Sequence, residues 1–340
     1  MRRALADALV AAWAADGVVS RALAPLGVMY GVVMSVRNAA YASGLRRVTP
    51  TSAPTISVGN LTVGGTGKTP VSAWFAEQLA ARGARPGIVL RGYGADEPLV
   101  HRTLVPSAVV VADPDRVRGS ACAVASGARA IVLDDAFQHR RAGRTVDVVL
   151  VAAEQGLPGR CLPAGPLREP WSGIRRADAL IVTRKTASPE AASGMASALS
   201  ARWGRPVAVM HLAPGALRRV DGAAEASSAA VPAPGSRVLA VSGIGEPAAF
   251  HGQLAASGFD VTPMPFPDHH AFTAADVQQV VARADGVGAV VCTLKDAVKL
   301  TPLWPARAPT LWYLSQAVRL EAGQGILDGL LDRLAPISNP

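Results

Sequence analysis

The hydrophobic residues of this chain come mainly in short, nearly unbroken runs. Six such runs occupy residues 55–58, 87–90, 108–111, 130–133, 146–151 and 179–182. Unalternated runs of this length are typical of parallel strands that helices cover on both faces. A helical pattern at 71–82 separates the first two runs, and a helix is expected to open at 113–118. Because strand and helix patterns alternate, the first 210 or so residues predict a doubly wound, mostly parallel α/β sheet.

A second, smaller α/β set follows this region. Residues 223–236 are rich in Ala, Ser, Pro and Gly, which predicts a linker or surface loop. Beyond it, strands are expected near 238–241 and 289–293, and helices near 247–257 and 274–284. The predicted organisation is therefore an N-terminal helical segment at 1–50, a core at 51–222, the linker at 223–236 and a second lobe at 237–340.

Composition excludes a disordered chain and favours anionic neighbours. Half of the 340 residues are hydrophobic and 17% are charged, so the chain can bury a sizeable core. A net charge of +9 and a pI near 10.2 suit a nucleic acid, an anionic membrane or a phosphorylated substrate. Cys122, Cys161 and Cys292 lie far apart without metal-ligand spacing, as expected of reduced thiols in a cytosolic protein.

The N-terminal segment contains an uncharged stretch at 22–36 between Arg21 and Arg37. It is shorter than the roughly 20 residues that span a bilayer. Arg46 and Arg47 follow, which suits a segment held at an anionic cytoplasmic leaflet. The alternative is a helix packed on the protein's own core. We expect membrane association without a full crossing.

A glycine-rich turn follows the first strand and precedes a helix, which is the order of a P-loop. In such a loop, backbone N–H groups point at phosphate oxygens, and the helix presents its positive end to the anion. Lys68 is expected to reach the β- and γ-phosphates, and the Thr69 hydroxyl to bind Mg²⁺. Thr62 stands where the strict pattern has glycine, so an ordinary Gly-rich turn is the alternative. The expected nucleotide-binding residues are Thr62, Val63, Gly64, Gly65, Thr66, Gly67, Lys68 and Thr69.

Two adjacent carboxylates, Asp134 and Asp135, end the run at 130–133. An acid at the end of a strand downstream of a P-loop commonly reaches the Mg²⁺ directly or through water. A helix cap is the alternative. The predicted metal ligands are thus Thr69, Asp134 and Asp135.

Phosphoryl transfer to an alcohol also needs a group that accepts the hydroxyl proton. Asp96, at the carboxyl end of a strand, and His269, in the second lobe, are the candidates. The alternatives are a turn residue and a helix-entry residue, respectively. Side chains for binding anions are Arg91, Arg116, His139, Arg140, Arg141 and Arg168.

Several motifs are specific to one family. They are the sequence from Val58 to Pro70, Arg91-Gly92-Tyr93-Gly94, Asp96-Glu97-Pro98, Leu133 to His139, Leu162 to Glu169, Gly243-Ile244-Gly245, Asp268-His269 and Thr293 to Lys299. In this order the chain resembles the tetraacyldisaccharide 4′-kinases, the lipid A 4′-kinases of Gram-negative bacteria. Members of that family carry the same departure at the position of Thr62.

The resemblance implies an ATP- and Mg²⁺-dependent kinase at the cytoplasmic face of the bacterial inner membrane. It would phosphorylate the 4′-hydroxyl of a tetraacylated glucosamine disaccharide 1-phosphate to give lipid IVA. Asp96 would help deprotonate that hydroxyl, with His269 as its partner in a dyad and Lys68 as the phosphate-binding cation. Gln138 joins Arg91, Arg116, His139 and Arg168 as an expected substrate residue. The expected partners are the lipid and the membrane surface, with no nucleic acid and no obligate protein partner.

Two other functions remain open from the sequence. A P-loop ATPase could use hydrolysis to switch a partner or membrane attachment. A non-catalytic relative could bind the lipid alone, since the segment between Tyr93 and Asp96 is shorter than in relatives.

Overall fold

The computed structural model describes residues 13, 17–92, 94, 96–220, 230–245 and 247–335. The chain divides into two compact units. The first comprises Met1–Gly92, Leu104–Leu212 and Val318–Pro340, and the second comprises Tyr93–Thr103 and Ala213–Ala317. The first half of the predicted linker, 223–229, and the N-terminal residues before Val18 other than Trp13 and Gly17, lie outside the described residues.

Parallel strands form the sheet of the first unit. Their order is β3 (Val109–Ala112), β2 (Pro86–Leu90), β4 (Ala130–Asp134), β1 (Thr55–Asn60), β5 (Val146–Ala152), β6 (Ala179–Arg184) and β7 (Val207–Arg219). Each neighbouring pair is parallel. The predicted α/β class and the six predicted strands are therefore confirmed, and β1 lies in the middle, between β4 and β5.

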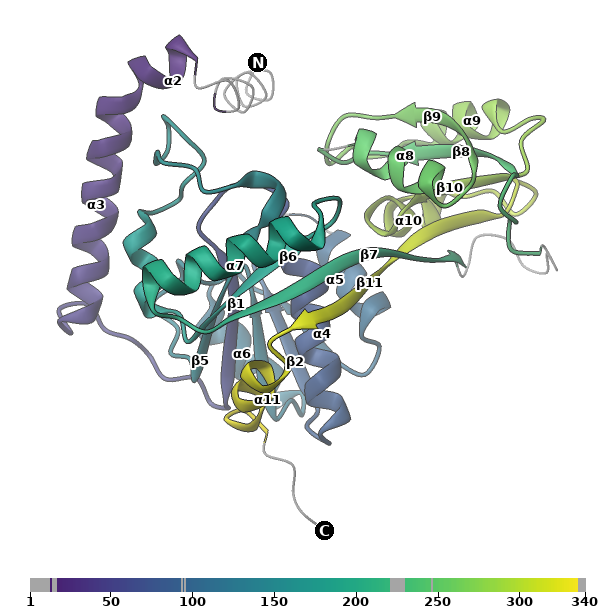
Figure 1. The fold of residues 1–340 in the computed structure, drawn as a ribbon. Coiled ribbons are helices and arrows are strands. Elements are labelled where there is room, and N and C mark those ends of the chain that lie inside the picture. The colour runs from purple at the N-terminus through teal and green to yellow at the C-terminus, as the bar shows by residue number, and fades with distance from the viewer. Residues whose placement is uncertain are drawn as a thin grey trace. The chain divides into compact units, whose positions relative to one another are not determined.

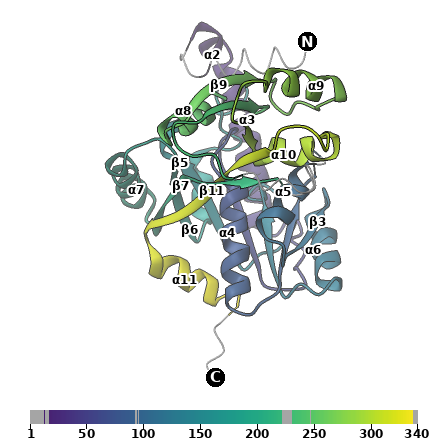
Figure 2. The same ribbon diagram turned by 90° about the vertical axis from the view of Figure 1, so that its right-hand side faces the viewer.

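Helices cover both faces of this sheet (Figures 1 and 2). On one face, α4 (Lys68–Ala81) and α11 (Gln324–Asp332) pack into one apolar cluster with alternate strand residues such as Ile56 and Ile88. On the other, α6 (Arg116–Ala125) packs on Val89 and its neighbours, and α7 (Pro189–Trp203) packs beside Leu180. Successive residues thus point to opposite faces, and both faces are buried.

The first unit also includes α2 (Val18–Ala22) and the long helix α3 (Ala24–Ala42), with the short 3₁₀ turns η1 (Ala153–Gln155) and η2 (Trp171–Arg176). Figure 1 shows α3 as one long purple helix. Its buried Gly27 and Gly31 lie near the backbone or side chains of Cys161 and Ala164. No described helix is both long enough and apolar enough to cross a bilayer.

The opposite face of α3 is apolar and faces solvent. Its exposed side chains, between 47% and 68% accessible, are Leu26, Val28, Met29, Val32, Val33 and Val36. A surface helix normally places polar residues on that face. This face is therefore a large exposed apolar surface of the kind that usually marks an interaction site.

Four parallel strands lie wholly or partly in the second unit. Strands β11 (Leu311–Ala322), β10 (Ala289–Thr293), β8 (Arg237–Ser242) and β9 (Asp260–Pro265) are neighbours in that order. Its helices are α8 (Pro247–Ala256), α9 (Ala274–Arg283) and α10 (Leu294–Leu300), followed by the turn η3 (Thr301–Leu303). The helix α5 (Asp96–Leu104) begins in this unit.

The division of the chain differs from the predicted boundaries at 222 and 237. The segment Val318–Pro340 belongs to the first unit, and Ala213 already belongs to the second. The boundary falls inside the two long neighbouring strands β7 and β11. A boundary within a continuous strand has no compositional signal of the kind that marks a linker, and α11 joins the first core through Leu327, Leu330 and Leu331.

Candidate active site

The glycine-rich loop extends from the carboxyl end of β1 to the start of α4. Every residue of β1 is buried, and α4 begins at Lys68 with Gly67 as its N-cap. Gly67 has φ +83°, and a Cβ there would lie 2.3 Å from Leu212 Cδ1. Only glycine adopts this left-handed conformation readily and fits this space. The local sequence therefore folds as a strand, a glycine turn and the start of a helix, which is the arrangement that binds phosphate groups.

Neighbouring strand ends hold the loop in place. The Thr62 hydroxyl donates to Gln155 Oε1 (3.1 Å), and the Val63 N–H donates to the Pro166 carbonyl (2.8 Å). At the far end, the Thr183 hydroxyl donates to the Thr66 carbonyl (3.0 Å). Thr62 and Thr66 are both buried, which leaves Gly64 and Gly65 as the exposed residues of the loop.

Lys68 and Asp135 lie close together beside the loop. Lys68 Nζ is 3.5 Å from the Gly64 carbonyl oxygen and 3.9 Å from Asp135 Oδ1. Arg168 donates to the same carboxylate oxygen at 2.7 Å. Asp135 has φ +48°, a conformation that costs a non-glycine residue about 1–2 kcal/mol. The structure thus brings together three of the residues predicted from the sequence.

Asp134 faces α4. It is buried and accepts a hydrogen bond from the Ser72 hydroxyl (3.0 Å). Ser72 lies three residues after Thr69, so the two hydroxyl residues share one side of the helix. Two carboxylates and a hydroxyl are hard oxygen donors of the kind that Mg²⁺ prefers. Within the described ranges, no group of three or more His, Cys, Asp or Glu residues could hold a metal by itself; Mg²⁺ normally completes its shell with water and phosphate oxygens.

The other predicted substrate residues have different surroundings. Arg116 is buried, and its guanidinium donates to the carbonyls of Asp113 (2.9 Å) and Asp134 (3.0 Å). Arg116 therefore joins the backbone at the carboxyl ends of β3 and β4. Arg91 is exposed just after β2. Gln138 Nε2 donates to the Asn60 carbonyl at the end of β1 (2.8 Å).

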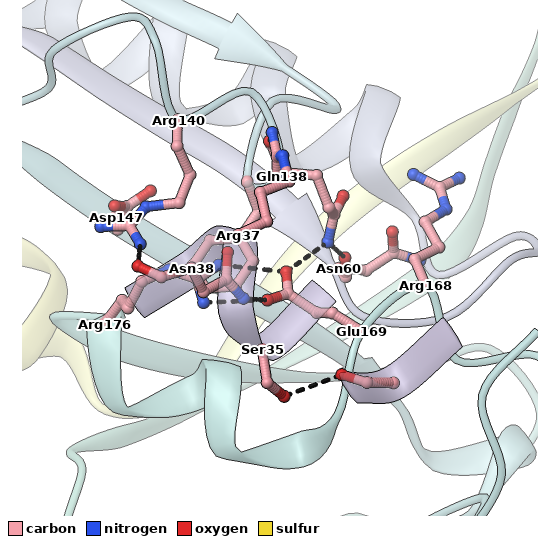
Figure 3. Close-up of polar contacts among 12 residues, drawn as sticks. Ser35, Arg37, Asn38, Asn60, Gln138, Arg140, Asp147, Arg168, Glu169 and Arg176 are labelled. Carbon is pink, nitrogen blue, oxygen red and sulfur yellow. Dashed lines mark hydrogen bonds and ion pairs between the residues drawn. The ribbon is translucent and has the colours of Figure 1, made fainter. Parts of the chain in front are cut away.

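Glu169 is a residue that the sequence reasoning did not select, although it stands next to Arg168 in a quoted motif. Its fully buried carboxylate accepts two hydrogen bonds from Arg176 (2.9 and 3.0 Å). Gln138 (3.0 Å) and Asn38 of α3 (2.6 Å) also donate to it. Figure 3 shows these side chains converging on Glu169. A buried carboxylate needs such a full set of donors.

Lys185 is a second residue that the sequence reasoning missed. Its Nζ donates to the Gly65 carbonyl (3.1 Å), so another cation lies against the loop. Glu154 Oε1 accepts three consecutive backbone N–H groups, from residues 185–187 (2.6 to 3.1 Å). Burial raises the pKa of Glu154, but these N–H groups outweigh burial and hold it below its usual value. The position of Lys185 in the sequence could have indicated this role, because it directly follows the buried strand β6. Polar residues that follow parallel strands lie at the edge of the sheet where ligands bind.

Asp96 and His269 belong to the second unit. Asp96 is the first residue of α5 and is buried. The His269 side chain is 56% exposed, with Nε2 3.9 Å from Asp268 Oδ1. Across the residues that the structure describes, no hydrogen bond or ion pair joins Asp96 to His269. Their joint role therefore stays a prediction.

Comparison with known proteins decides the family. The model of the family described as Tetraacyldisaccharide-1-P 4'-kinase matches residues 19–335. The chain belongs to this family. It is similar to the tetraacyldisaccharide 4'-kinase of Alkalilimnicola ehrlichii, at 39% identity over 94% of this chain and 95% of the relative. The enzyme of the same name from Pseudomonas putida is 37% identical over 98% of each chain.

A solved structure shares the fold. The crystal structure of LpxK from Aquifex aeolicus in complex with ATP aligns with a TM-score of 0.74 and 29% sequence identity. The alignment covers 93% of this chain and 99% of that one. As a member of the tetraacyldisaccharide 4'-kinase family, the chain is a kinase, and the recognition made from its motifs is confirmed.

His139 gives this kinase a pH-dependent stability. Burial lowers the pKa of its imidazole from 6.5 to about 4, and the positive charges of Arg116 and Arg144 act in the same direction. Because the unfolded chain binds a proton near pH 6.5 and the folded chain does not, the free energy of unfolding should fall as pH decreases from 6.5 to about 4. His139→Gln should flatten this dependence in urea unfolding curves. His269→Gln, at an exposed histidine, is the control, and equal slopes in the two variants would refute the assignment.

Proposed function

We propose that this chain transfers the γ-phosphoryl group of ATP to the 4′-hydroxyl of a tetraacylated glucosamine disaccharide 1-phosphate, forming lipid IVA. The observation that carries the proposal is the cluster of Lys68, Asp135 and Arg168 beside a glycine-rich loop, in a chain that the family model matches almost throughout. The ATP in the Aquifex aeolicus LpxK structure supports the choice of nucleotide.

The triphosphate would be held at the loop between Thr62 and Thr69. The backbone N–H groups and the start of α4 supply partial positive charge there. Lys68 and Lys185 add two ammonium groups, since both contact loop carbonyls. These fixed charges stabilise the negative charge that shifts within the phosphates during transfer.

Mg²⁺ would be held by Thr69 and Asp134. Asp134 contacts Ser72 on the side of α4 that also carries Thr69, which favours it over Asp135. Asp135 instead accepts from Arg168 and lies near Lys68, so it would orient these two cations. When bound, the metal supplies positive charge to the β- and γ-phosphate oxygens.

Asp96 and His269 would remove the proton of the acceptor hydroxyl as a dyad. Asp96 is a buried carboxylate at the first turn of α5, and His269 presents an exposed imidazole. The competing function, a P-loop ATPase that acts as a switch, would need neither group. A lipid-binding relative without activity would release no phosphorylated product.

The lipid substrate would be met at the membrane surface through α3. Its exposed apolar side chains, including Val28, Val32 and Val36, lie at intervals of four residues along one face. Arg46 and Arg47, which are exposed just beyond its end, suit anionic headgroups. At a membrane surface this apolar face would be buried among the acyl chains. The cytoplasmic face of the inner membrane is the location that supplies both ATP and the lipid.

The first prediction concerns turnover. With ATP, Mg²⁺ and the disaccharide 1-phosphate, the purified protein should form a bisphosphorylated lipid. Mass spectrometry of the lipid product measures this reaction. Lys68→Ala should lower kcat about 1,000-fold or more, because the lysine neutralises charge on the transferred group. Arg283→Ala, which removes an exposed cation of α9, should leave the rate unchanged. ATP hydrolysis without a lipid product would overturn the kinase proposal in favour of the ATPase.

The second prediction concerns the dyad. If Asp96 and His269 act as a unit, Asp96→Asn combined with His269→Gln should lower kcat little more than the more damaging single substitution. ATP affinity, measured by calorimetry, should change little in all three variants, because neither residue is assigned to the nucleotide. Losses that multiply in the double variant would show that the two residues act independently.

The third prediction concerns α3. Introducing Asp at Val28, Val32 and Val36 should release the protein from sedimenting anionic vesicles, since charged residues at an apolar interface oppose insertion. Asp at the exposed Val231 and Leu303, which lie in the second unit, is the control. Equal vesicle binding by both variants would assign membrane attachment to another surface.

A further inference from the structure

Loops follow the carboxyl ends of β8 and β9 in the second unit, whereas β10 leads directly into α10. The two loops carry Gly243 and His269, respectively, and the motif from Thr293 to Lys299 spans the end of β10 and most of α10. Because these strands are parallel, their carboxyl ends meet at one edge of the sheet. His269 has a proposed part in the reaction, whereas the motif from Thr293 to Lys299 has so far no function assigned to it.

Asp296 lies in the first turn of α10 and contacts the loop that follows β8. Its side chain is fully buried. Asp296 Oδ2 accepts hydrogen bonds from the Gly243 N–H (2.9 Å) and the Thr293 hydroxyl (2.7 Å). Lys299 Nζ lies 3.2 Å from Asp296 Oδ1. A buried carboxylate with a cation and two donors is a rigid anchor, because losing any of these partners leaves charge without compensation.

Both members of this ion pair connect to the backbone around His269. Gly243, whose N–H is bound to Asp296, accepts the N–H of His269 through its carbonyl (3.0 Å). Lys299 Nζ donates to the carbonyl of His270 (3.2 Å). The backbone at His269 is therefore held before the residue through Gly243 and the Asp296 carboxylate, and after it through the Lys299 ammonium.

The conformation of His269 shows why it needs such support. Its φ is +53°. Residues other than glycine rarely adopt this backbone conformation, and they keep it only when the surrounding structure imposes it. The His269 imidazole has Asp268 as its neighbour at 3.9 Å and is more than half exposed. The loop continues into His270, whose Nε2 is 3.1 Å from Asp276 Oδ2 and whose ring stacks on Phe266.

Gly243 fits closely against this anchor. A Cβ at that position would lie 3.0 Å from Asp296 Oδ1 and 3.4 Å from His270 Cβ. A larger residue would therefore displace the Asp296 carboxylate or the backbone at His270 by a few tenths of an ångström. The loop that carries Gly243 therefore also helps to fix the backbone of His269.

We propose that Asp296 and Lys299 are positioning residues that fix the strained backbone on which the His269 imidazole is presented to the reacting hydroxyl. Neither residue takes part in proton transfer. They act through two backbone hydrogen bonds, at Gly243 and His270. The proposal rests on the proposed function of His269 and extends it to two residues of α10.

The experiment replaces Lys299 in the full-length protein. Lys299→Met should lower kcat about 10- to 100-fold, since small displacements of a catalytic group cost this much, while KM for ATP changes less than about twofold. Lys299→Arg should restore most of kcat, because it keeps the charge and the donor. Arg237→Met removes the cation of an exposed pair with Asp260 between β8 and β9 and is the matched control, with unchanged kcat.

Two further measurements separate positioning from loss of folding. In amide NMR spectra of Lys299→Met, the resonances of Gly243, His269 and His270 should shift, whereas those of β8 and β10 should not. Gly243→Ala, which keeps every charge, should produce the same set of shifts and a similar loss of kcat. Unshifted amides at these three residues in either variant would overturn the proposal.

A double-mutant cycle distinguishes this inference from the proposed function. In a His269→Ala background, Lys299→Met should lower kcat no further if the pair acts through His269. A further loss of the full 10- to 100-fold would overturn the positioning role. Should His269→Ala alone leave kcat unchanged, the catalytic assignment of His269 fails, and the amide shifts still decide whether Asp296 and Lys299 hold its backbone.

Discussion

The burial of β1 between β4 and β5 is the constraint on which the site of the first unit depends. Parallel strands end at the same edge of a sheet, so a fully buried β1 places the glycine-rich loop beside Asp134 and Asp135. Packing of α4 beneath that edge then fixes the direction of its N-terminus. This arrangement brings Lys68 to within 3.9 Å of Asp135.

The dipeptide Arg168-Glu169 links that edge to the N-terminal helix. Arg168 donates to Asp135, while the neighbouring Glu169 gathers Arg176, Gln138 and α3 around one buried carboxylate. The Tyr30 hydroxyl of α3 also donates to the carbonyl of Arg168 (3.0 Å). The helix that we assign to the membrane surface therefore shares hydrogen-bonding partners with the acid beside the phosphate loop. If α3 lies at the membrane as proposed, these contacts would fix the distance between the membrane surface and Asp135.

The second unit solves a related problem with the same geometry. Its parallel strands also end in loops that carry polar groups, but here a buried ion pair supports an exposed imidazole. Rigid support of the backbone and solvent access at the imidazole suit the role in proton transfer that we propose for His269. In both units the residues of the proposed site follow the carboxyl ends of parallel strands.

Local pattern in the sequence determined six of the seven strands of the first unit, the helix after the glycine-rich loop and the motifs that identify the family; it did not predict β7. These signals lie within a few neighbouring residues, where hydrophobic periodicity and turn chemistry act. Only the tertiary structure decided that Val318–Ala335 belongs to the first unit, that Arg116 is buried at the ends of β3 and β4, and that Glu169, Lys185 and Asp296 bind distant segments of the chain. Each of these contacts joins residues far apart in the chain, and the partner of a buried charge depends on strand order, which short-range pattern does not contain.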